Sequence, residues 1–594
     1  MKQALHSLIA SALTQLHAQN VLTHVDLSAI KIELPRDKSH GDFATNVAMA
    51  LAKPNGMNPR ALAESLIAAL PATNWLISAE IAGPGFINFR LDAAAKFSVL
   101  AKVLQTGSDF GRINMGEGKS VQVEFVSANP TGPLHVGHGR GAAYGSALVS
   151  VLRHAGYDVQ AEYYVNDAGR QMDILATSVW LRYLALCGEP IVFPSNGYKG
   201  DYIITTARAL LDEQGERLRH AESVVFASVT PDQVLNDAGE VVSGDKEKHI
   251  DDIIVHAREL LGADDYRLVL DKVLHEILFD IKEDLAEFGV HFDNWFSERS
   301  LTDSGIVDAA LTRLEANNQL YEKEGAVWFK STDYNDAKDR VVVRENGIKT
   351  YFASDIAYHY DKLARGFEKV INIWGSDHHG YIPRVRGAIQ AMGEDDSRLD
   401  VLLVQFAVLY RGGEKASMST RSGEFVTLRE LREEIGNDAT RFFYVMRKCD
   451  QHMDFDLDLA KSKSNENPLF YIQYAHARCC GVFTQAESRG LREWTQTEGL
   501  SHLALLTEES EADLAQKVAQ FPEVIGTAAR DAEPHQIAYY LRDLAHQLHS
   551  YYNNTPLLVE DDALRMARLT LLSATRVVLA NGLTLLGVSA PERM

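Results

Sequence analysis

The most constraining feature of this chain is a strand, a tight loop, a helix and a second strand that follow one another within residues 121–165. VQVEFVS is apolar and short enough for a buried strand, and a Gly/Pro-rich loop separates it from the small-residue helix GRGAAYGSALVSVLRHAG. The next strand candidate, DVQAEYYV, completes a βαβ unit, which requires parallel strands. Similar strands return at VINIWGSDHHG and VLLVQFAVLY. The sequence therefore predicts an α/β domain built on a parallel sheet.

Turn chemistry and hydrophobic periodicity divide the rest of the chain. At about 100–200 residues per domain, 594 residues suffice for three or four domains. Residues 1–112 combine an amphipathic starting helix with strand-like patterns, so they are predicted to be a separate α+β domain. The α/β pattern covers 113–460, with a polar stretch near 190–260 that is predicted to be an insertion. Residues 461–594 carry apolar stripes of helical period and predict an all-helical domain.

The composition excludes several classes of protein. Apolar residues make up 46% of the chain and charged residues 24%, which is typical of a globular protein and excludes disorder as the dominant state. The four cysteines form no C-x-x-C pair, so a disulfide framework and a thiolate zinc site are not expected. No apolar run is long enough to cross a membrane and the first residues lack the pattern of a secretory leader, so we expect a cytoplasmic protein with no membrane partner. The net charge of −22 argues against nonspecific binding of polyanions.

The pair His135 and His138 stands where the first strand of the βαβ unit ends and its helix begins. Ligands of such folds bind at the carboxyl edge of the sheet, and imidazoles at a helix N-terminus can contact phosphate oxygens. Gly137, between the histidines, permits close approach of a base or sugar to the backbone. The alternative is that both are ordinary loop histidines near a turn. We interpret the pair as catalytic groups of a nucleotide site.

A second motif follows near residue 415. Lys415, Met418, Ser419 and Arg421 belong to the stretch KASMSTRSG, a hydroxyl-rich cationic loop. Such a loop can close over a triphosphate and stabilise the charge on a leaving pyrophosphate. A Ser/Gly/Arg loop of this kind is also common on protein surfaces, so alone it is weak evidence.

Together the two motifs resemble the HIGH and KMSKS signatures of class I aminoacyl-tRNA synthetases, in the same order. The resemblance implies a Rossmann-type catalytic domain with insertions, which forms an aminoacyl-adenylate from ATP, with Mg²⁺, and then acylates the terminal adenosine of tRNA. The sequence departs from the family at the second lysine of KMSKS, where Thr420 and Arg421 stand, and at the first, where Ser417 stands. We expect Lys415 and Arg421 to supply the loop's positive charge, and the division of roles between them stays open.

Two further segments resemble the arginyl-tRNA synthetases within that class. VEFVSAN resembles the family's V-E-F-x-S-x-N segment, and TYFASDIAY resembles its T-Y-x-x-x-D-I-A-Y stretch. A guanidinium is a planar fork of donors and needs carboxylates that accept paired hydrogen bonds, for which Glu124 and Asp355 are the candidates. Alone, a carboxylate at the end of a strand could equally face solvent. The resemblance implies that the arginine substrate is bound by Glu124, Ser127, Asn129, Tyr351 and Asp355.

The segment WGSDHHG also follows an apolar strand and resembles a segment that lies against the nucleotide in bacterial arginyl enzymes. One alternative interpretation is that its Asp-His-His cluster binds a metal ion. However, adjacent side chains of an extended segment point to opposite sides, so two neighbouring histidines rarely bind one ion. We expect no metal ligands here and assign Gly375, Asp377 and His378 to ATP binding.

The remaining resemblances concern tRNA. SHGDFATN, at residues 39–46, resembles the start of the appended N-terminal domain that touches the tRNA elbow, and DALR, at 562–565, resembles the motif of the anticodon-binding domain. Arginines at helical spacing (Arg565, Arg568, Arg576) are predicted to give this domain positive surface despite the net charge. Tyr551 and Tyr552 could stack on unpaired bases or pack in the core. By family analogy, Asn553 and Met594 are further candidates for contact with tRNA.

These observations predict an enzyme of the bacterial arginyl type, with L-arginine, ATP and tRNA(Arg) as substrates. The resemblance further implies that activation depends on bound tRNA, that no editing domain is needed, and that the enzyme is a monomer. The alternatives are a class I synthetase for another amino acid, a nucleotidyltransferase for a small substrate, and a noncatalytic RNA-binding paralogue. Missing zinc thiolates disfavour cysteine, and acidic pocket groups disfavour glutamate and glutamine.

Overall fold

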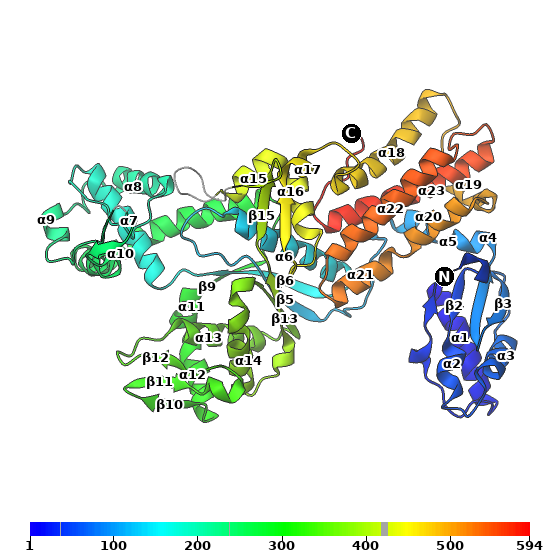
Figure 1. Cartoon of the computed structure of the whole chain (residues 1–594), viewed down its shortest axis with the longest axis horizontal. Coiled ribbons are helices and arrows are strands. Elements are labelled where there is room, and N and C mark those ends of the chain that lie inside the picture. The colour runs from blue at the N-terminus through cyan, green and yellow to red at the C-terminus, as the bar shows by residue number, and fades with distance from the viewer. Residues whose placement is uncertain (36, 237, 417–425) are drawn as a thin grey trace.

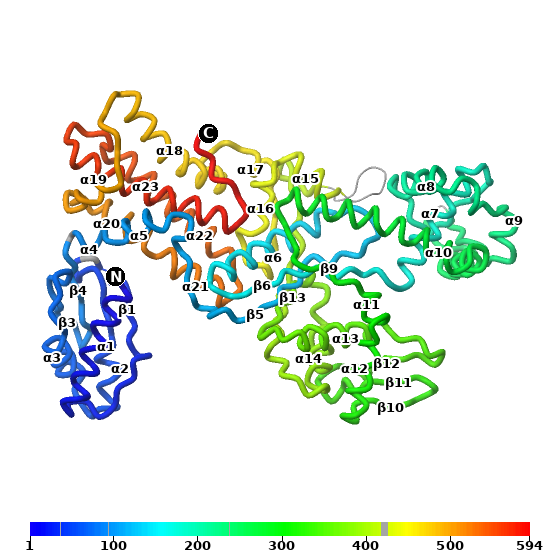
Figure 2. The backbone as a smooth tube through the Cα atoms, turned by 180° about the vertical axis from the view of Figure 1, so that it is seen from behind, coloured from blue at the N-terminus to red at the C-terminus, as the bar shows by residue number. Residues whose placement is uncertain are grey.

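The structure is a computed structural model that describes residues 1–35, 37–236, 238–416 and 426–594. Figure 1 shows a central sheet region from which a helical arm extends to one side and a helical domain to the other, with the N-terminal region below that domain. Figure 2 shows the same arrangement from behind. No helix among the described residues has both the length and the apolarity to cross a membrane.

The N-terminal region has its own hydrophobic core, in which helices cover an antiparallel sheet of order β1-β2-β4-β3. Its elements are α1 (Lys2–Ala18), β1 (Ile32–Glu33), β2 (Phe43–Thr45), α2 (Val47–Ala52), α3 (Pro59–Ala69), β3 (Leu76–Ala82) and β4 (Phe86–Leu91). The predicted starting helix and the presence of strands in this region are confirmed. The buried residues of this core end at Ala95, however, and Phe97–Phe110 pack into the main core. The reason is that α5 (Ser98–Thr106), which follows α4 (Ala93–Lys96), packs its apolar face on a C-terminal helix.

The central sheet is parallel throughout and has the order β14-β13-β5-β6-β9. Its strands are β5 (Ser120–Glu124), β6 (Asp158–Val165), β9 (Asn294–Ser297), β13 (Lys369–Gly375) and β14 (Leu399–Val404), and α6 (Val136–His154) connects β5 to β6. The predicted βαβ unit is therefore confirmed. The strand order reverses between β5 and β13, so the crevice at their carboxyl ends is the expected ligand site.

Two insertions leave this sheet. The polar stretch predicted as an insertion is part of the helical arm, which contains α7 (Arg170–Leu186), α8 (Asp201–Gln214), α9 (Glu222–Val225), β7 (Val234–Leu235), β8 (Val241–Ser243) and α10 (Lys246–Glu287). A second insertion, not predicted from sequence, lies between β9 and β13 and carries α11 (Glu298–Asp303), α12 (Ile306–Ala316), β10 (Leu320–Lys323), β11 (Ala326–Phe329), β12 (Arg340–Val343) and α13 (Tyr351–Ala364). Helix α14 (Ile382–Ala391) connects β13 to β14. The helical segment α10, which is kinked at Gly262, returns the chain from the arm to the sheet (Figure 1).

After the sheet the chain becomes helical. A small sheet combines β15 (Ala407–Arg411) and β16 (Glu414–Lys415) with β17 (Met453–Asp456), which follows the first two of these helices. The helices are α15 (Leu428–Ile435), α16 (Asn437–Val445), α17 (Leu457–Lys461), α18 (Pro468–Ser488), α19 (Gln496–Ser501), α20 (Glu509–Ala519), α21 (Phe521–Arg530), α22 (His535–Asn554) and α23 (Asp562–Leu585). One hydrophobic core runs from the central sheet into this helical domain, so the two are packed as one body.

Candidate active site

The two motif histidines form the N-terminus of α6 and hold each other in place. The backbone N–H of Gly137 donates to His135 Nδ1 at 3.1 Å, and the backbone N–H of His135 donates to His138 Nδ1 at 3.3 Å. The two rings lie 3.7 Å apart between centroids. Because each Nδ1 accepts a hydrogen bond, each neutral ring must carry its proton on Nε2. Each Nε2 is therefore a hydrogen-bond donor.

Burial keeps both rings neutral at physiological pH. Desolvation lowers the pKa of His135, and desolvation together with repulsion from His135 lowers the pKa of His138 to about 3. Both residues are partly exposed. Two neutral N–H donors at a helix N-terminus are suited to donate hydrogen bonds to the oxygens of a phosphate group.

The turn after β5 has an unusual backbone. Val126 has φ of 66° and Ser127 has φ of 42°. Positive φ is costly for any residue with a side chain, most of all for a β-branched one, and such strain gathers at functional sites. The turn allows the Ser127 hydroxyl to donate to Glu124 Oε1 at 2.9 Å while it accepts from the backbone N–H of Tyr164 at 3.1 Å. The exposed Asn129 accepts from Asn166 Nδ2 at 2.7 Å.

Glu124 also pairs with a residue that the sequence analysis did not identify. Lys362 Nζ, which is fully buried, donates to Glu124 Oε2 at 2.5 Å and to Asn372 Oδ1 at 2.8 Å. Glu124 is only 6% exposed, so it does not face solvent as the alternative interpretation required. Each of its two carboxylate oxygens therefore already accepts one hydrogen bond from the protein, from Ser127 and from Lys362.

Asp355 lies in the second turn of α13. The hydroxyl of Tyr381 donates to its carboxylate. Desolvation raises the pKa of Asp355 to about 6, and repulsion from Glu124 adds to this. The backbone N–H of Arg170, at the start of α7, donates to the Tyr351 hydroxyl at 3.2 Å, and Tyr351 is 54% exposed. Tyr351 and Asp355 therefore share one helix face, with Tyr351 at the rim.

Four carboxylates from four segments surround one tyrosine. The pKa of the Tyr164 hydroxyl is raised by burial and then by repulsion from Glu298, Asp355, Glu124 and Asp167. The carboxyl groups of Glu124 and Asp355, far apart in sequence, thus belong to one cluster, which we call the acidic pocket. Glu298 and Asp167 belong to the same pocket and were not predicted.

The members of this acidic pocket differ in their partners. Asp167 is paired with Arg299, whose Nε lies 3.2 Å from its carboxylate. Glu298, only 5% exposed, has no hydrogen-bond partner on Oε2 among the described residues. Desolvation, with repulsion from Asp355 and Asp167, raises the pKa of Glu298 to about 7. Within the described part of the chain, Asp355 and Glu298 are the two carboxylates of the pocket without an ion-pair partner.

The remaining predicted nucleotide residues lie in two places, the end of β13 and the loop near residue 415. Gly375 ends β13, and a Cβ at this position would come within 2.5 Å of Asp377 Oδ1. Asp377 and His378 are exposed, and Asp377 Oδ2 lies 3.6 Å from His378 Nε2. They belong to a 3-10 turn (Ser376–Tyr381), not to the extended segment assumed in the sequence analysis. Lys415 is exposed on β16. Met418, Ser419 and Arg421 lie outside the described residues.

The predicted tRNA contacts separate into exposed and buried residues. Tyr552 is half-buried, Asn553 is exposed and Met594 is 54% exposed. Arg478 of α18 lies over the Tyr552 ring at 4.7 Å and donates to Asn553 Oδ1 at 3.4 Å. Tyr551 is only 1% exposed, and its hydroxyl donates to Glu511 at 3.2 Å. Tyr551 is therefore a core residue, which corrects its assignment as a contact to tRNA.

Two of the arginines expected to form positive surface are also buried. Arg565 is 1% exposed and bonds to backbone carbonyls before α23. Arg568 is 7% exposed, and its Nε lies 2.8 Å from Glu511. The amphipathic period placed both on the helix face that the core covers. They stabilise the helical domain rather than present charge to RNA.

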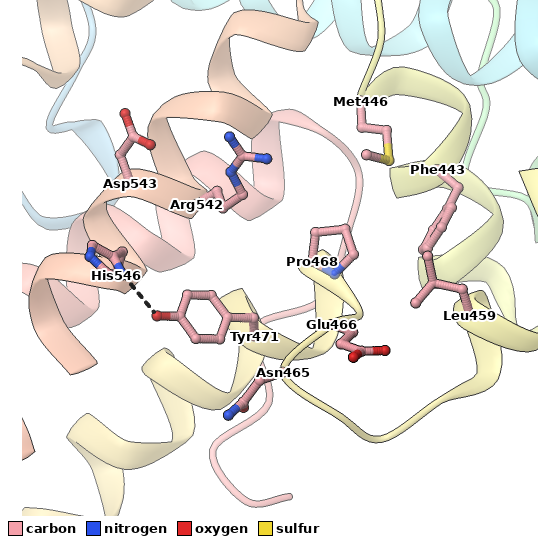
Figure 3. A pocket seen from close by; sticks show the side chains of 10 residues that line it. All are labelled: Phe443, Met446, Leu459, Asn465, Glu466, Pro468, Tyr471, Arg542, Asp543 and His546. Atoms are coloured by element: carbon pink, nitrogen blue, oxygen red, sulfur yellow. Dashed lines mark hydrogen bonds between the residues drawn. The ribbon is translucent and has the colours of Figure 1, made fainter. Parts of the chain in front are cut away.

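A cavity of 540 Å³ is lined by residues of α16, α17, α18 and α22, and the histidine pair is not among its lining residues. Figure 3 shows Tyr471 of α18 hydrogen-bonded to His546 of α22, at 3.3 Å, and Arg542 on the same helix as His546. Further along the same two helices, the Tyr471 and His549 rings lie 4.4 Å apart, and Arg478 lies over Tyr474 at 4.6 Å.

Comparisons with known proteins match the whole arrangement. Residues 3–91 match the arginyl tRNA synthetase N terminal domain, 99–183 and 247–454 match the class I (R) tRNA synthetase catalytic domain, and 472–594 match the DALR anticodon binding domain. The chain is 61% identical to arginine–tRNA ligase of Hydrogenovibrio crunogenus and 57% to that of Thioalkalivibrio sulfidiphilus, in both cases over 100% of both chains.

Solved structures resemble it in the same way. A putative arginyl-tRNA synthetase of Campylobacter jejuni, 31% identical, superposes with a TM-score of 0.72 over 85% of this chain and 100% of the other. Arginyl-tRNA synthetase of Thermus thermophilus, 24% identical, has a TM-score of 0.72 with all of both chains covered and shows the same fold.

Proposed function

This chain belongs to the arginyl-tRNA synthetase family, and we propose that the acidic pocket beside the histidine pair is the site where it selects arginine. As an arginine–tRNA ligase of class I, it activates L-arginine with ATP and transfers the arginyl group to tRNA(Arg). The roles of individual residues, described below, are proposals.

The guanidinium group of arginine is assigned to Asp355 and Glu298. These are the carboxylates of the pocket that have no basic partner among the described residues, and Glu298 Oε2 is buried without a hydrogen bond. That orphaned oxygen is the observation that carries the proposal, because an unpaired buried acceptor calls for a donor. Tyr351 borders this end of the pocket.

Glu124 takes a different role from the one expected. Because Lys362 already neutralises it, its remaining lone pairs are assigned, with Ser127 and Asn129, to the polar end of the substrate nearer the histidines. This places the arginine carboxylate toward the N-terminus of α6, where it can attack the α-phosphorus of ATP.

ATP is assigned to the crevice between β5 and β13. His135 and His138 donate hydrogen bonds from Nε2–H to phosphate oxygens. The rest of the nucleotide is assigned to contacts with Gly137, Gly375, Asp377 and His378. Lys415 approaches the phosphates from β16, together with Met418, Ser419 and Arg421, and Mg²⁺ enters with ATP. Neither chemical step needs a protein nucleophile, so the site acts by positioning and by stabilising the charge that develops on pyrophosphate.

The tRNA is assigned to the exposed face of α18 and α22, with Tyr552, Asn553 and Met594 near the anticodon. Arg478 supplies positive charge there, and stacked bases are a common mode of single-strand recognition. We further propose that activation requires bound tRNA, and that the enzyme acts as a monomer in the cytoplasm, where its three substrates are available.

The test is ATP–pyrophosphate exchange with each amino acid, with and without tRNA. Exchange with arginine that appears only when tRNA is added supports the whole proposal. Exchange with arginine in the absence of tRNA contradicts the tRNA requirement alone. Equal exchange with lysine or citrulline contradicts the pocket assignment, because a paired carboxylate site rejects both ligands.

A further inference from the structure

Helix α15 is joined directly to the histidine motif. The backbone N–H of Val136 donates to Val426 O at 3.0 Å, and the backbone N–H of Leu428 donates to Leu134 O at 2.8 Å. These two bonds form an antiparallel bridge between His135 and Thr427, the residue that caps α15. The segment that carries His135 is therefore paired with the first turn of α15.

Side-chain packing reinforces this joint. A Cβ at Gly139 would lie 2.8 Å from Leu428 Cδ1 and 2.7 Å from the Tyr444 ring, so the glycine permits α15 to approach the start of α6. The Tyr444 hydroxyl donates to Val136 O at 3.0 Å. A displacement of α15 would thus move the N-terminus of α6 or open a cavity beside it.

The other side of α15 is held by charged groups of α10. Arg432 is 7% exposed, and its Nη2 lies 2.5 Å from Asp284, itself 2% exposed, and 2.7 Å from Glu287. One turn earlier, Arg429 Nη1 lies 2.8 Å from Asp280. The acidic end of α10 therefore binds two successive arginines on one face of α15.

We propose that Arg432 and Asp284 are positioning residues for the adenylation step, because they fix α15 against α10 and α15 in turn fixes the N-terminus of α6. Neither residue contacts the acidic pocket or the histidines. Their effect passes through Leu428 and the backbone bridge. The inference rests on the phosphate-binding role proposed above for His135 and His138.

The expected signature is a change in kcat without a matching change in KM. Hydrogen bonds to developing charge act mainly in the transition state, and misplacement by about 1 Å can cost about 100-fold in rate. The arginine pocket is built by β5, β6, α11 and α13, which this anchor does not hold. The KM for arginine should therefore stay within about two-fold of its original value.

The first experiment measures aminoacylation of tRNA by Asp284→Leu, Arg429→Gln and the double variant Asp284→Leu/Arg432→Met. We expect kcat to fall about ten-fold or more in Asp284→Leu and by less in Arg429→Gln, which removes a half-exposed contact. The double variant replaces the buried pair with apolar side chains that keep the helices in contact, so it should recover most of the lost kcat. Thermal unfolding identifies any variant that has not folded.

Two controls make the outcome decisive. Glu213→Gln removes an ion pair between α8 and α10, in which Glu213 lies 2.6 Å from Lys272, and should leave kcat unchanged. His138→Gln reports on the proposed function itself. If His138→Gln keeps full activity, the role of the histidines is wrong. If it loses activity while folded Asp284→Leu and Arg429→Gln keep theirs, or if their KM for arginine rises as kcat falls, the positioning role is overturned and the histidine role stands.

Discussion

Lys362 Nζ lies 2.5 Å from Glu124 Oε2, and the lysine side chain has no exposed surface. The same amino group lies 4.2 Å from the centre of the Tyr358 ring. A buried ammonium is costly unless its charge is matched, so the pair is stable only as a unit. The pocket that we propose for a cationic substrate therefore contains a cation of its own.

Replacing Lys362 should destabilise the enzyme because it leaves Glu124 buried without a counterion. We expect Lys362→Met to reduce the free energy of unfolding by about 3–5 kcal/mol. The double variant Lys362→Met/Glu124→Gln should recover a large part of this loss, since the amide can still accept from Ser127. The measurement is the urea midpoint of unfolding. As a control, Lys369→Met breaks the exposed ion pair with Asp400 and should change the free energy of unfolding by less than about 1 kcal/mol.

Arginine binding should become tighter as pH rises from 5 toward 8. The raised pKa values of Glu298, about 7, and Asp355, about 6, mean that these groups are partly protonated at the lower pH, and the guanidinium binds their ionised forms. Binding should therefore release protons, which calorimetry in buffers of different ionisation enthalpy measures. In Glu298→Gln, the midpoint of the pH dependence of arginine binding should move down toward the pKa of Asp355, about 6. A binding constant that is independent of pH would show that neither group faces the ligand.

The same two groups predict how the free enzyme responds to pH. Their pKa values are raised in the fold, so between their unfolded and folded values the folded protein binds more protons than the unfolded chain. Their contribution to stability is present at low pH and is lost as pH rises through 6 to 7. Bound arginine compensates for that loss. The increase in Tm on adding arginine should thus be larger at pH 8 than at pH 5.5, to the extent that both groups bind it.

Asp355→Asn should affect arginine far more than ATP. The amide keeps the size of the side chain and can still accept from Tyr381, but it removes the charge that pairs with the guanidinium. A hydrogen-bonded charge pair of this kind contributes about 2–4 kcal/mol, so the KM for arginine should rise about 30-fold or more. The KM for ATP, measured in the same exchange assay, should change by less than about three-fold. Equal losses for both substrates would mean that Asp355 does not contact the side chain of arginine.

How much the sequence could predict depends on the kind of residue. His135 was found because it lies where a readable strand gives way to a helix, whereas Glu124 and Asp355 were found through the resemblance of VEFVSAN and TYFASDIAY to family segments. Glu298 directly follows strand β9, so its place at the carboxyl end of a strand could have marked it as a candidate. Lys362 lies seven residues after Asp355, on the same face of α13, but a lysine in a polar stretch is read as solvent-exposed.

Tertiary packing, and not hydrophobic periodicity, determines which of these side chains are buried and which are available to contact RNA. The sequence allowed Tyr551 and Tyr552 to be either core or RNA-binding residues, and only the packing of α22 against α20 separates them. The anchor of α15 is equally invisible in sequence, because Asp284 and Arg432 belong to helices far apart in the chain. Their burial arises from the return of α10 to the sheet, which no local pattern encodes.

The neighbouring tyrosines of α22 provide a matched test of the tRNA surface. Tyr552→Ala removes a ring held under Arg478, and loss of one stacked base costs about 1–3 kcal/mol, so the KM for tRNA should rise about ten-fold or more. The kcat at saturating tRNA should change little, because the active site is distant. Tyr551→Phe removes only the buried hydroxyl that bonds to Glu511, so it should lower stability by about 1 kcal/mol and leave the KM for tRNA unchanged. An unchanged KM in Tyr552→Ala would exclude this face of α22 from the tRNA interface, whereas a raised KM in Tyr551→Phe would show that the packing of α22, rather than stacking, controls the affinity.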